Sequence, residues 1–258
     1  EFRRVLFRSA NKSIYIKDEK ALEDYIIKSG NIDKKIKKIN GLDTLTIHEV
    51  GDDHLYTGLK TPMKPTAFLI SDQDKKEKIA KLFGEIMDVM GLDLTDDSLK
   101  GTPERVAKMY IDEIFSGLNP NNKPKIALFD NIYQYNQMLV EKNITFYSNC
   151  EHHFVPIIGK AHIAYISSGK VIGLSKLNRI VQYYAKRPQV QERLTNQIAE
   201  DLKNTLQTDD VAVIIDAKHL CVSSRGIKDD TSATVTSYYG GEFNTPSKIN
   251  ELLNYLKD

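Results

Sequence analysis

Hydrophobic and polar positions along the chain follow two different patterns, and the change comes near Ser71. Before it, the segments 31–40 and 49–54 are polar and have no clear period, which is typical of a solvated, partly disordered arm. After it, apolar residues recur at the spacings of amphipathic helices and of strands. We therefore predict a polar arm over residues 1–70 and a folded region that follows it.

The first part of the folded region predicts two helices. Apolar residues repeat at helical spacing over 71–91, after a capping Ser71. A second helix is predicted over 102–117, with Thr102 as N-cap and Gly117 as its end. We group both as an N-terminal helical pair, residues 71–118. Three further helices are predicted over 175–186, 189–207 and 245–258.

Strand-like alternation lies between and after these helices. We predict a strand at 144–147, then a hairpin in which 155–168 turns back at Ser168-Gly169 into 170–175. Two more strands are predicted at 210–222 and 231–240. This order of elements favours an α+β fold with an antiparallel sheet.

Composition narrows the classes of function. The 258 residues carry 36 basic and 35 acidic side chains, so no global field attracts nucleic acid or an anionic membrane. No apolar run approaches the roughly 20 residues that span a bilayer. Two cysteines are too few for a disulfide-rich secreted scaffold, so we expect a cytoplasmic protein. Residues 1–10 lack an initiator Met and are arginine-rich, and we interpret them as an assembly artefact in preference to a targeting fragment.

A candidate metal site begins with Cys150 and His153, whose C-x-x-H spacing lets both side chains of one turn bind one ion. Thiolate and imidazole suit zinc. The other cysteine, Cys221, would make three ligands and leave a fourth position open, as in catalytic zinc sites. C-x-x-H alone is a weak signal, and a Cys150–Cys221 disulfide or ordinary packing are the alternatives.

Two histidines accompany these ligands. His219 lies two residues before Cys221, and in an extended segment both side chains would face one pocket, where His219 could move protons. His152 adjoins His153 and should point elsewhere, as a second imidazole of the pocket.

Anion and base recognition are suggested by other residues. Ser175, read as a helix N-cap, is followed by two cations, Lys176 and Arg179, which together could form a phosphate site. Two solvated charges are the commoner explanation of such a triplet. Further cations are Arg105, Lys108 and Arg225, which would suit a polyphosphate. In the segment that opens with Gln191, the carboxylate of Glu192 could accept both donors of a guanine edge, although a first-turn acid needs no such role.

Four long motifs together resemble the GTP cyclohydrolase I family. They are, in chain order, TPERVAKMYIDEIFSGL, CEHHFVPIIGKAHIAYI, IGLSKLNRIVQYYAKRPQVQERLTNQIA and HLCVSSRGIKDDTSATVTS. The resemblance covers roughly residues 71–243 and leaves out the arm before about residue 50. It implies the tunnelling fold (T-fold), an antiparallel sheet with helices on one face, in residues 119–258. It also implies a homodecamer with active sites between subunits.

The resemblance also assigns roles. It makes Cys150, His153 and Cys221 the zinc ligands, His152 and His219 the catalytic imidazoles, and Ser175 a catalytic residue beside the ribose. It places Gln191 and Glu192 on the guanine, and Arg105, Lys108, Lys176, Arg179 and Arg225 around the triphosphate, with Arg105 and Lys108 serving a neighbour's site. The implied reaction opens the imidazole ring of GTP, with His219 protonating N7. It releases C8 as formate and rearranges the rest to 7,8-dihydroneopterin triphosphate, the first pterin of folate synthesis.

Three rival readings fit parts of the pattern. A zinc deaminase would carry H-x-E followed by P-C-x-x-C, and this chain has neither motif. A non-hydrolytic relative on the same fold would lack the three zinc ligands. A zinc-stabilised module that binds nucleic acid or protein is disfavoured by the +1 net charge and by the missing fourth ligand. Such a module should unfold when the metal is removed.

Overall fold

A computed structural model of the chain describes residues 5–9, 12–16 and 58–257. The chain divides into two compact units, Glu1–Leu55 and Tyr56–Asp258. In the first unit, β1 (Val5–Ser9) pairs antiparallel with β2 (Lys12–Ile16). Most of the predicted arm, including the segments expected to be disordered, lies outside the described residues.

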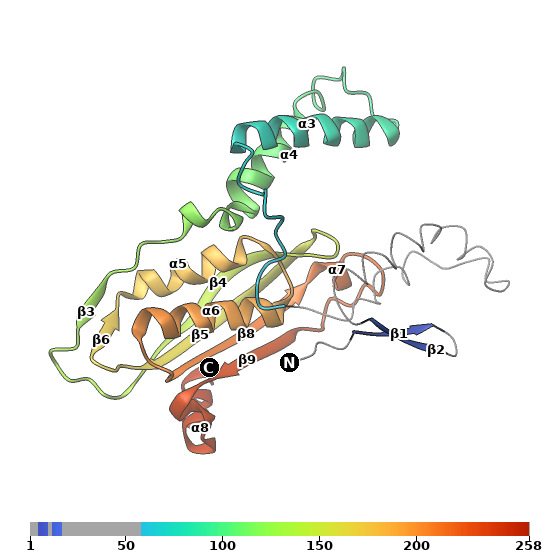
Figure 1. The fold of residues 1–258 in the computed structure, drawn as a ribbon. Coiled ribbons are helices and arrows are strands. Elements are labelled where there is room, and N and C mark those ends of the chain that lie inside the picture. Colours follow the sequence, from blue (N-terminus) through green and yellow to red (C-terminus); the bar gives the residue numbers. More distant parts are fainter. Residues whose placement is uncertain (1–4, 10–11, 17–57, 258) are drawn as a thin grey trace. The chain divides into compact units, whose positions relative to one another are not determined.

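A five-stranded sheet forms the centre of the second unit, in the order β7-β4-β5-β8-β9 (Figure 1). Neighbouring strands run antiparallel except β7, which pairs parallel with β4. Mixed helices and an antiparallel sheet confirm the α+β class. The strands are β4 (Met138–Cys150), β5 (Pro156–Ile166), β7 (Pro188–Gln189), β8 (Val211–His219) and β9 (Thr234–Tyr239).

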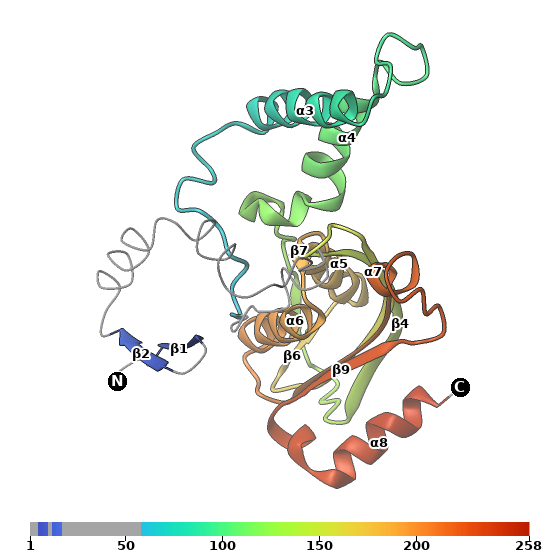
Figure 2. The same ribbon diagram turned by 90° about the vertical axis from the view of Figure 1, so that its right-hand side faces the viewer.

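Helices α5 (Leu174–Ala185) and α6 (Gln191–Leu206) cover one face of this sheet (Figures 1 and 2). Their apolar sides meet inward-facing strand residues such as Phe146 and Ile163 in one fully buried cluster. Together these contacts form the main core of the unit.

Helix α8 (Pro246–Leu256) packs on the opposite face, so the prediction of helices on one face only is wrong. Successive strand residues point to opposite faces. Ile163 therefore lies in the main core, while Ala164 lies in a second apolar cluster with Leu252 of α8. Around these residues both faces of the sheet are apolar, so each face must be covered by a helix to keep it from water.

The predicted hairpin of 155–168 with 170–175 is also wrong. Strand β6 (Lys170–Ile172) pairs with β3 (Leu128–Asp130) in a separate two-stranded sheet. The physical reason is that β4 and β8 already occupy the two edges of β5. No backbone groups of β5 remain for β6.

The helical pair consists of α3 (Asp72–Val89) and α4 (Thr102–Lys108), and α4 continues into a π-helix at Met109–Ile114. The hydroxyl of Ser71 caps α3 by accepting from the Asp74 N–H at 3.1 Å, as predicted. Thr102 is the first residue of α4, and Gly101 takes the cap position instead. Short 3₁₀ turns follow at Ser116–Leu118 and Pro120–Asn122, and another, Gly241–Asn244, precedes α8.

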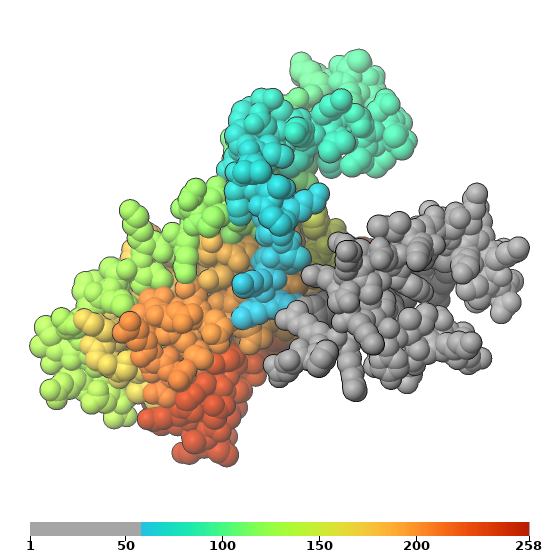
Figure 3. Space-filling view, in the orientation of Figure 1, coloured from blue at the N-terminus to red at the C-terminus, as the bar shows by residue number. Residues whose placement is uncertain are grey.

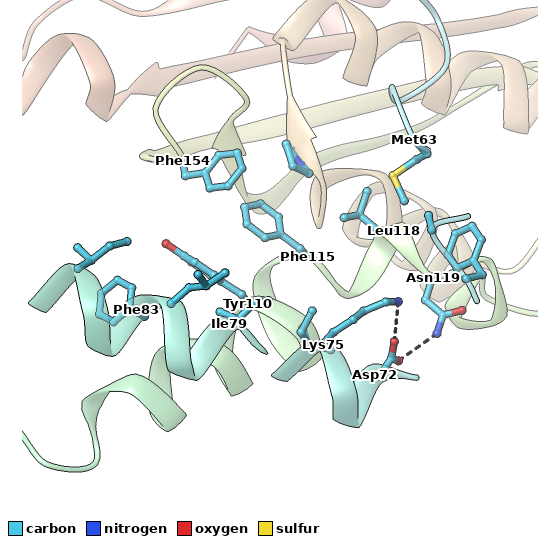
Figure 4. A pocket seen from close by; sticks show the side chains of 16 residues that line it. Met63, Asp72, Lys75, Ile79, Phe83, Tyr110, Phe115, Leu118, Asn119 and Phe154 are labelled. Atoms are coloured by element: carbon cyan, nitrogen blue, oxygen red, sulfur yellow. Dashed lines mark hydrogen bonds and ion pairs between the residues drawn. The ribbon is translucent and has the colours of Figure 1, made fainter. Parts of the chain in front are cut away.

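An apolar cavity of about 470 Å³ lies between α3, the π-helix and the turn after β4 (Figure 4). Tyr110, Phe115 and Phe154 form an aromatic cluster on its wall, with ring centroids 5.0 to 6.3 Å apart. Phe154 follows the predicted ligand His153 directly, so the helical pair contacts the segment that carries the candidate metal site.

Among the described residues, no helix combines the length and apolarity needed to cross a membrane.

Candidate metal centre

A tight turn between β4 and β5 carries two of the predicted ligands. Cys150 is the last residue of β4, and its N–H donates to the Val155 carbonyl at 2.9 Å. The Phe154 N–H donates back to the Cys150 carbonyl at 2.8 Å. Phe154 adopts φ +54°, the left-handed conformation that closes such turns. The turn thereby folds His153 back toward Cys150.

The third predicted ligand, Cys221, lies just after the adjacent strand β8. In the pairing of β5 with β8, Ile157 lies opposite His219, so the end of β8 reaches the start of β5. Cys221 follows at once in the short helix α7 (Leu220–Ser223). The ligand atoms of Cys150, His153 and Cys221 lie within 4.8 Å of one another. Strand pairing alone therefore brings residues 71 positions apart in the sequence into one cluster.

The donor set fits a zinc ion. Two sulfurs and one imidazole nitrogen are soft and borderline ligands, and three protein ligands leave one tetrahedral position open. Burial raises the pKa of the Cys221 thiol, and the neighbouring Cys150 adds to this, while Arg225 acts in the opposite direction. A bound divalent cation would reverse this balance and hold both sulfurs as thiolates.

His219 lies at the end of β8, where its Nε2 is 2.8 Å from Oε1 of Gln191. The Gln191 amide nitrogen donates to the carbonyls of Ile215 and Thr234, so its Oε1 is the acceptor and His219 carries its proton on Nε2. Burial lowers the pKa of His219, and Glu192 acts in the opposite direction. This leaves a neutral imidazole with its lone pair on Nδ1.

His219 and Cys221 do not share one extended segment, contrary to the prediction. The extended segment ends at His219, and Cys221 lies in α7, so the two-residue spacing of a strand does not relate them. His152 was expected to point elsewhere than His153, as a second imidazole of the pocket and not as a ligand. Its Nδ1 lies 3.6 Å from the Cys150 sulfur, so its ring is close to one predicted ligand, although the cluster of possible ligand atoms consists of Cys150, His153 and Cys221.

The residues predicted to recognise the base, Gln191 and Glu192, lie at the start of α6. Gln191 is buried at 2% exposure and the three hydrogen bonds of its side chain are all to protein groups, whereas Glu192 is exposed. Of the two, Glu192 presents its carboxylate to solvent. Gln191 reaches the site through His219.

The predicted phosphate residues are not gathered at one place in this chain. Arg225 is close enough to influence the pKa of Cys221. Ser175, Lys176 and Arg179 lie in the first half of α5, whose far end leads into β7 beside Cys150. A 12-residue helix rises about 18 Å, so the start of α5 lies far from the metal ligands of its own chain.

Two details of these helices differ from the sequence prediction. Gly173 is the N-cap of α5, and Ser175 is the second helical residue, exposed to solvent. The Lys176 N–H already donates to the Gly173 carbonyl at 2.7 Å, which uses one of the predicted anion donors. Arg105 and Lys108 lie on α4, which packs against α3; there Arg105 donates to the Ser98 carbonyl and the Thr102 hydroxyl.

Sequence reasoning missed a buried ion pair beside the metal ligands. Arg193 is 3% exposed and contacts both carboxylate oxygens of Glu151, the residue between Cys150 and His152. A signal was present in the sequence. Arg193, Gln197 and Asp201 recur every four residues along a helix, on the side that also carries Leu194 and Ile198, and charged residues on an apolar side need partners.

The chain is similar to known proteins over most of its length. Residues 79–257 match the family described as GTP cyclohydrolase I. A GTP cyclohydrolase 1 of Flavobacterium johnsoniae is 61% identical over 219 residues, which cover 85% of this chain and 97% of that protein. GTP cyclohydrolase 1 of Vibrio parahaemolyticus is 54% identical over 201 residues, or 78% of this chain and 92% of that protein. The protein of that name from Aeromonas salmonicida is 53% identical over 201 residues, or 78% of this chain and 91% of that protein.

Proposed function

The chain belongs to the GTP cyclohydrolase I family, and from this membership we propose that it is a zinc enzyme that hydrolyses the imidazole ring of GTP. The products are formate and 7,8-dihydroneopterin triphosphate, the first pterin of folate synthesis. One observation carries the proposal most directly. The ligand atoms of Cys150, His153 and Cys221 lie within 4.8 Å of one another, which matches a three-ligand catalytic zinc site.

Zinc, when bound there, would supply a Lewis acid that activates water for hydrolysis at C8 of the guanine. The protein supplies the proton transfers. His219, with its Nε2–H on Gln191, is held with Nδ1 available to accept the proton released by the attacking water and to deliver it to N7. His152, 3.6 Å from the Cys150 sulfur through its Nδ1, is the second imidazole for the later steps.

Substrate recognition follows from charge and hydrogen-bonding geometry. Glu192 would accept the two adjacent donors of the guanine edge. Gln191 orients His219 and contributes to the base site through it. Five cations would offset the triphosphate charge, and Ser175 would act beside the ribose. The cations are Lys176, Arg179, Arg225, Arg105 and Lys108.

A shared site between subunits would resolve the separation of these groups. The first turn of α5 is distant from the metal ligands of its own chain, so Ser175, Lys176 and Arg179 would reach the metal centre of a neighbouring copy. We propose the T-fold homodecamer of the family, with residues 119–258 as the catalytic domain and residues 71–118 as a helical pair that supplies Arg105 and Lys108 to a neighbour. We expect the enzyme in the cytoplasm.

The test measures both products and the metal together. Purified protein is incubated with GTP, and formate and pterin fluorescence are quantified before chelation, after chelation and after zinc is restored. We expect formate and pterin in equal amounts, loss of both on chelation, and recovery with zinc. Zinc-loaded protein that releases no formate from GTP would refute the proposal.

The same samples separate a catalytic zinc from a structural one. Circular dichroism is recorded on the chelated protein. Cys150 belongs to the main core and Cys221 packs against it, but most of that core is formed by apolar residues of the sheet and of α5 and α6 that are not ligands, so the chelated protein should keep its helix and strand signal. Unfolding on chelation would favour a zinc-stabilised module.

A further inference from the structure

A buried ion pair joins the metal-binding turn to helix α6, and we infer that Glu151 and Arg193 are positioning residues of the active site. They would hold the turn that carries Cys150 and His153 at a fixed place relative to the guanine-reading start of α6. That the start of α6 reads guanine rests on the proposed function. That the ion pair fixes the turn with Cys150 and His153 does not depend on it.

The guanidinium of Arg193 is held by every one of its nitrogens. Two of them contact the two oxygens of Glu151, and Nη2 lies 3.2 Å from Oε1. The third, Nε, donates to the Gly58 carbonyl at 2.8 Å. With the side chain 3% exposed, this planar fork has one orientation, which a lysine could not reproduce.

Glu151 is fixed through its backbone as well as its side chain. Its N–H donates to the Gln189 carbonyl at 3.0 Å, beside the pairing of Cys150 with Gln189. The residue sits between the ligand Cys150 and the imidazole of His152, and its Oε1 lies 3.9 Å from Nε2 of that ring. A shift of Glu151 would therefore move a zinc ligand and a catalytic imidazole together.

Arg193 connects this turn to two other segments. It follows Gln191 and Glu192 directly and points inward, whereas Glu192 is exposed. Through Gly58 it also holds the segment that runs over the outside of α6 (Figure 3). Gln197, one turn further on, holds the next residue of that segment by donating to the Leu59 carbonyl at 2.8 Å. One side chain thus sets the spacing between metal turn and base site.

The charge arrangement supports the same role. Glu151 directly follows Cys150 in the sequence, and its carboxylate and the two cysteine sulfurs would all be negative when zinc is bound. The Arg193 side chain is 3% exposed, where an unpaired charge would be strongly unfavourable, and the partly buried Glu151 carboxylate neutralises it. Outer partners of this kind commonly set the orientation of metal ligands.

The test compares two conservative variants with a matched control. Glu151→Gln and Arg193→Lys each remove the bidentate pair with little change in volume. The control is Asp201→Asn, which changes a buried carboxylate on the same helix, away from the metal turn. The Asp201 side chain is 6% exposed, and its Oδ1 lies 2.6 Å from Nζ of Lys123. Zinc affinity is measured at equilibrium against a chromogenic chelator, without substrate. We expect about tenfold weaker zinc binding in both pair variants and wild-type affinity in the control.

Kinetics with zinc at saturation give the second readout. We expect kcat for formate release to fall about tenfold in both pair variants with a smaller change in KM, because the groups that bind GTP are intact and only their alignment changes. The double variant should lose no more than either single variant, since the two residues act as one unit.

Each outcome decides the inference. Pair variants that match Asp201→Asn in zinc affinity and kcat would overturn it. Pair variants that unfold where the control stays folded would overturn it too, because the pair would then serve stability. If zinc binding weakens as expected but the wild-type protein releases no formate from GTP, the proposed function fails while the positioning of the metal turn stands.

Discussion

At the scale of single residues, Cys221 offers the sharpest test of the metal site. It is the proposed ligand that follows a separate strand, so Cys221→Ser should remove zinc binding and turnover and leave the core intact. We expect at least about a hundredfold loss of zinc affinity, more than for an outer partner. Metal analysis and formate release measure this.

The control for that variant is Val222→Ala, an exposed neighbour on the same short helix, which should behave as wild type. Stoichiometric zinc in purified Cys221→Ser would show that the sulfur is no ligand.

His162 makes a separate residue-scale prediction, far from the metal. Its Nδ1 accepts from the Asn143 N–H at 3.3 Å, so the neutral ring is the one the fold needs. Burial lowers the pKa of His162 from 6.5, Lys160 and Lys142 lower it further, and Asp216 raises it. The folded chain thus binds this proton less tightly than the unfolded chain. The stabilising contribution is complete above pH 6.5 and is lost as the pH falls through the lowered pKa.

A glutamine at this position cannot titrate, so His162→Gln isolates the effect. The melting temperatures of wild type and variant are compared from pH 7 to pH 5. We expect the melting temperature of the wild type to fall relative to that of the variant as the pH falls. A difference in melting temperature that does not change with pH would rule out His162 as the titrating group.

At the scale of elements, Gly117 fixes how the helical pair joins the sheet region. Its N–H donates to the Lys186 carbonyl at 2.9 Å, and Arg187 Nε donates to the Gly117 carbonyl at 2.9 Å. A Cβ at Gly117 would lie 2.0 Å from the Tyr183 carbonyl oxygen, so Gly117→Ala must separate the two backbones. We expect a loss of about 1–3 kcal/mol in the free energy of unfolding.

Gly84→Ala is the matched comparison. It lies inside α3, and a Cβ there meets nothing closer than 3.7 Å. Helix propensity alone should make this variant more stable by up to about 1 kcal/mol. Urea unfolding of both variants measures whether Gly117→Ala lowers the free energy of unfolding while Gly84→Ala raises it. A Gly117→Ala variant as stable as the wild type would mean that the two backbones are not in close contact.

The elements also show which parts of the fold the sequence could predict. Helical periodicity and local caps are short-range signals, so Ser71 and the stretch of α3 were predicted correctly. The partner of β6 depends on which edges of β5 are already occupied, which is a long-range property. The change from strand to helix after His219 was missed because an apolar run such as Leu220 to Val222 fits either state.

At the scale of the whole molecule, the site could be predicted only in part. Cys150, His153 and Cys221 were identified because cysteine is scarce in this chain and the C-x-x-H spacing is local. Arg193 was not identified, because a charged residue on a helix gives no indication of its partner until the strands are placed. The grouping of Lys176 and Arg179 with the metal came from family resemblance, and within one chain the fold separates them.

That separation makes subunit complementation the decisive whole-molecule test. Cys221→Ser removes the metal half of a site, and Lys176→Ala/Arg179→Ala removes the phosphate half. If each site combines halves from two copies, random co-assembly of the two inactive variants restores about one quarter of the sites, because both intact halves must meet. Activity is measured after co-expression with different tags and purification of mixed oligomers.

The control mixes Cys221→Ser with His153→Ala, whose defects lie in one metal cluster of one chain. In that mixture every site has a defective metal half, so no activity should return. Recovery in the first mixture alone would establish that α5 of one copy completes the metal centre of another. Inactivity in both would mean that the start of α5 and the metal ligands act within a single chain, which would require α5 to move from the place it occupies beside β4.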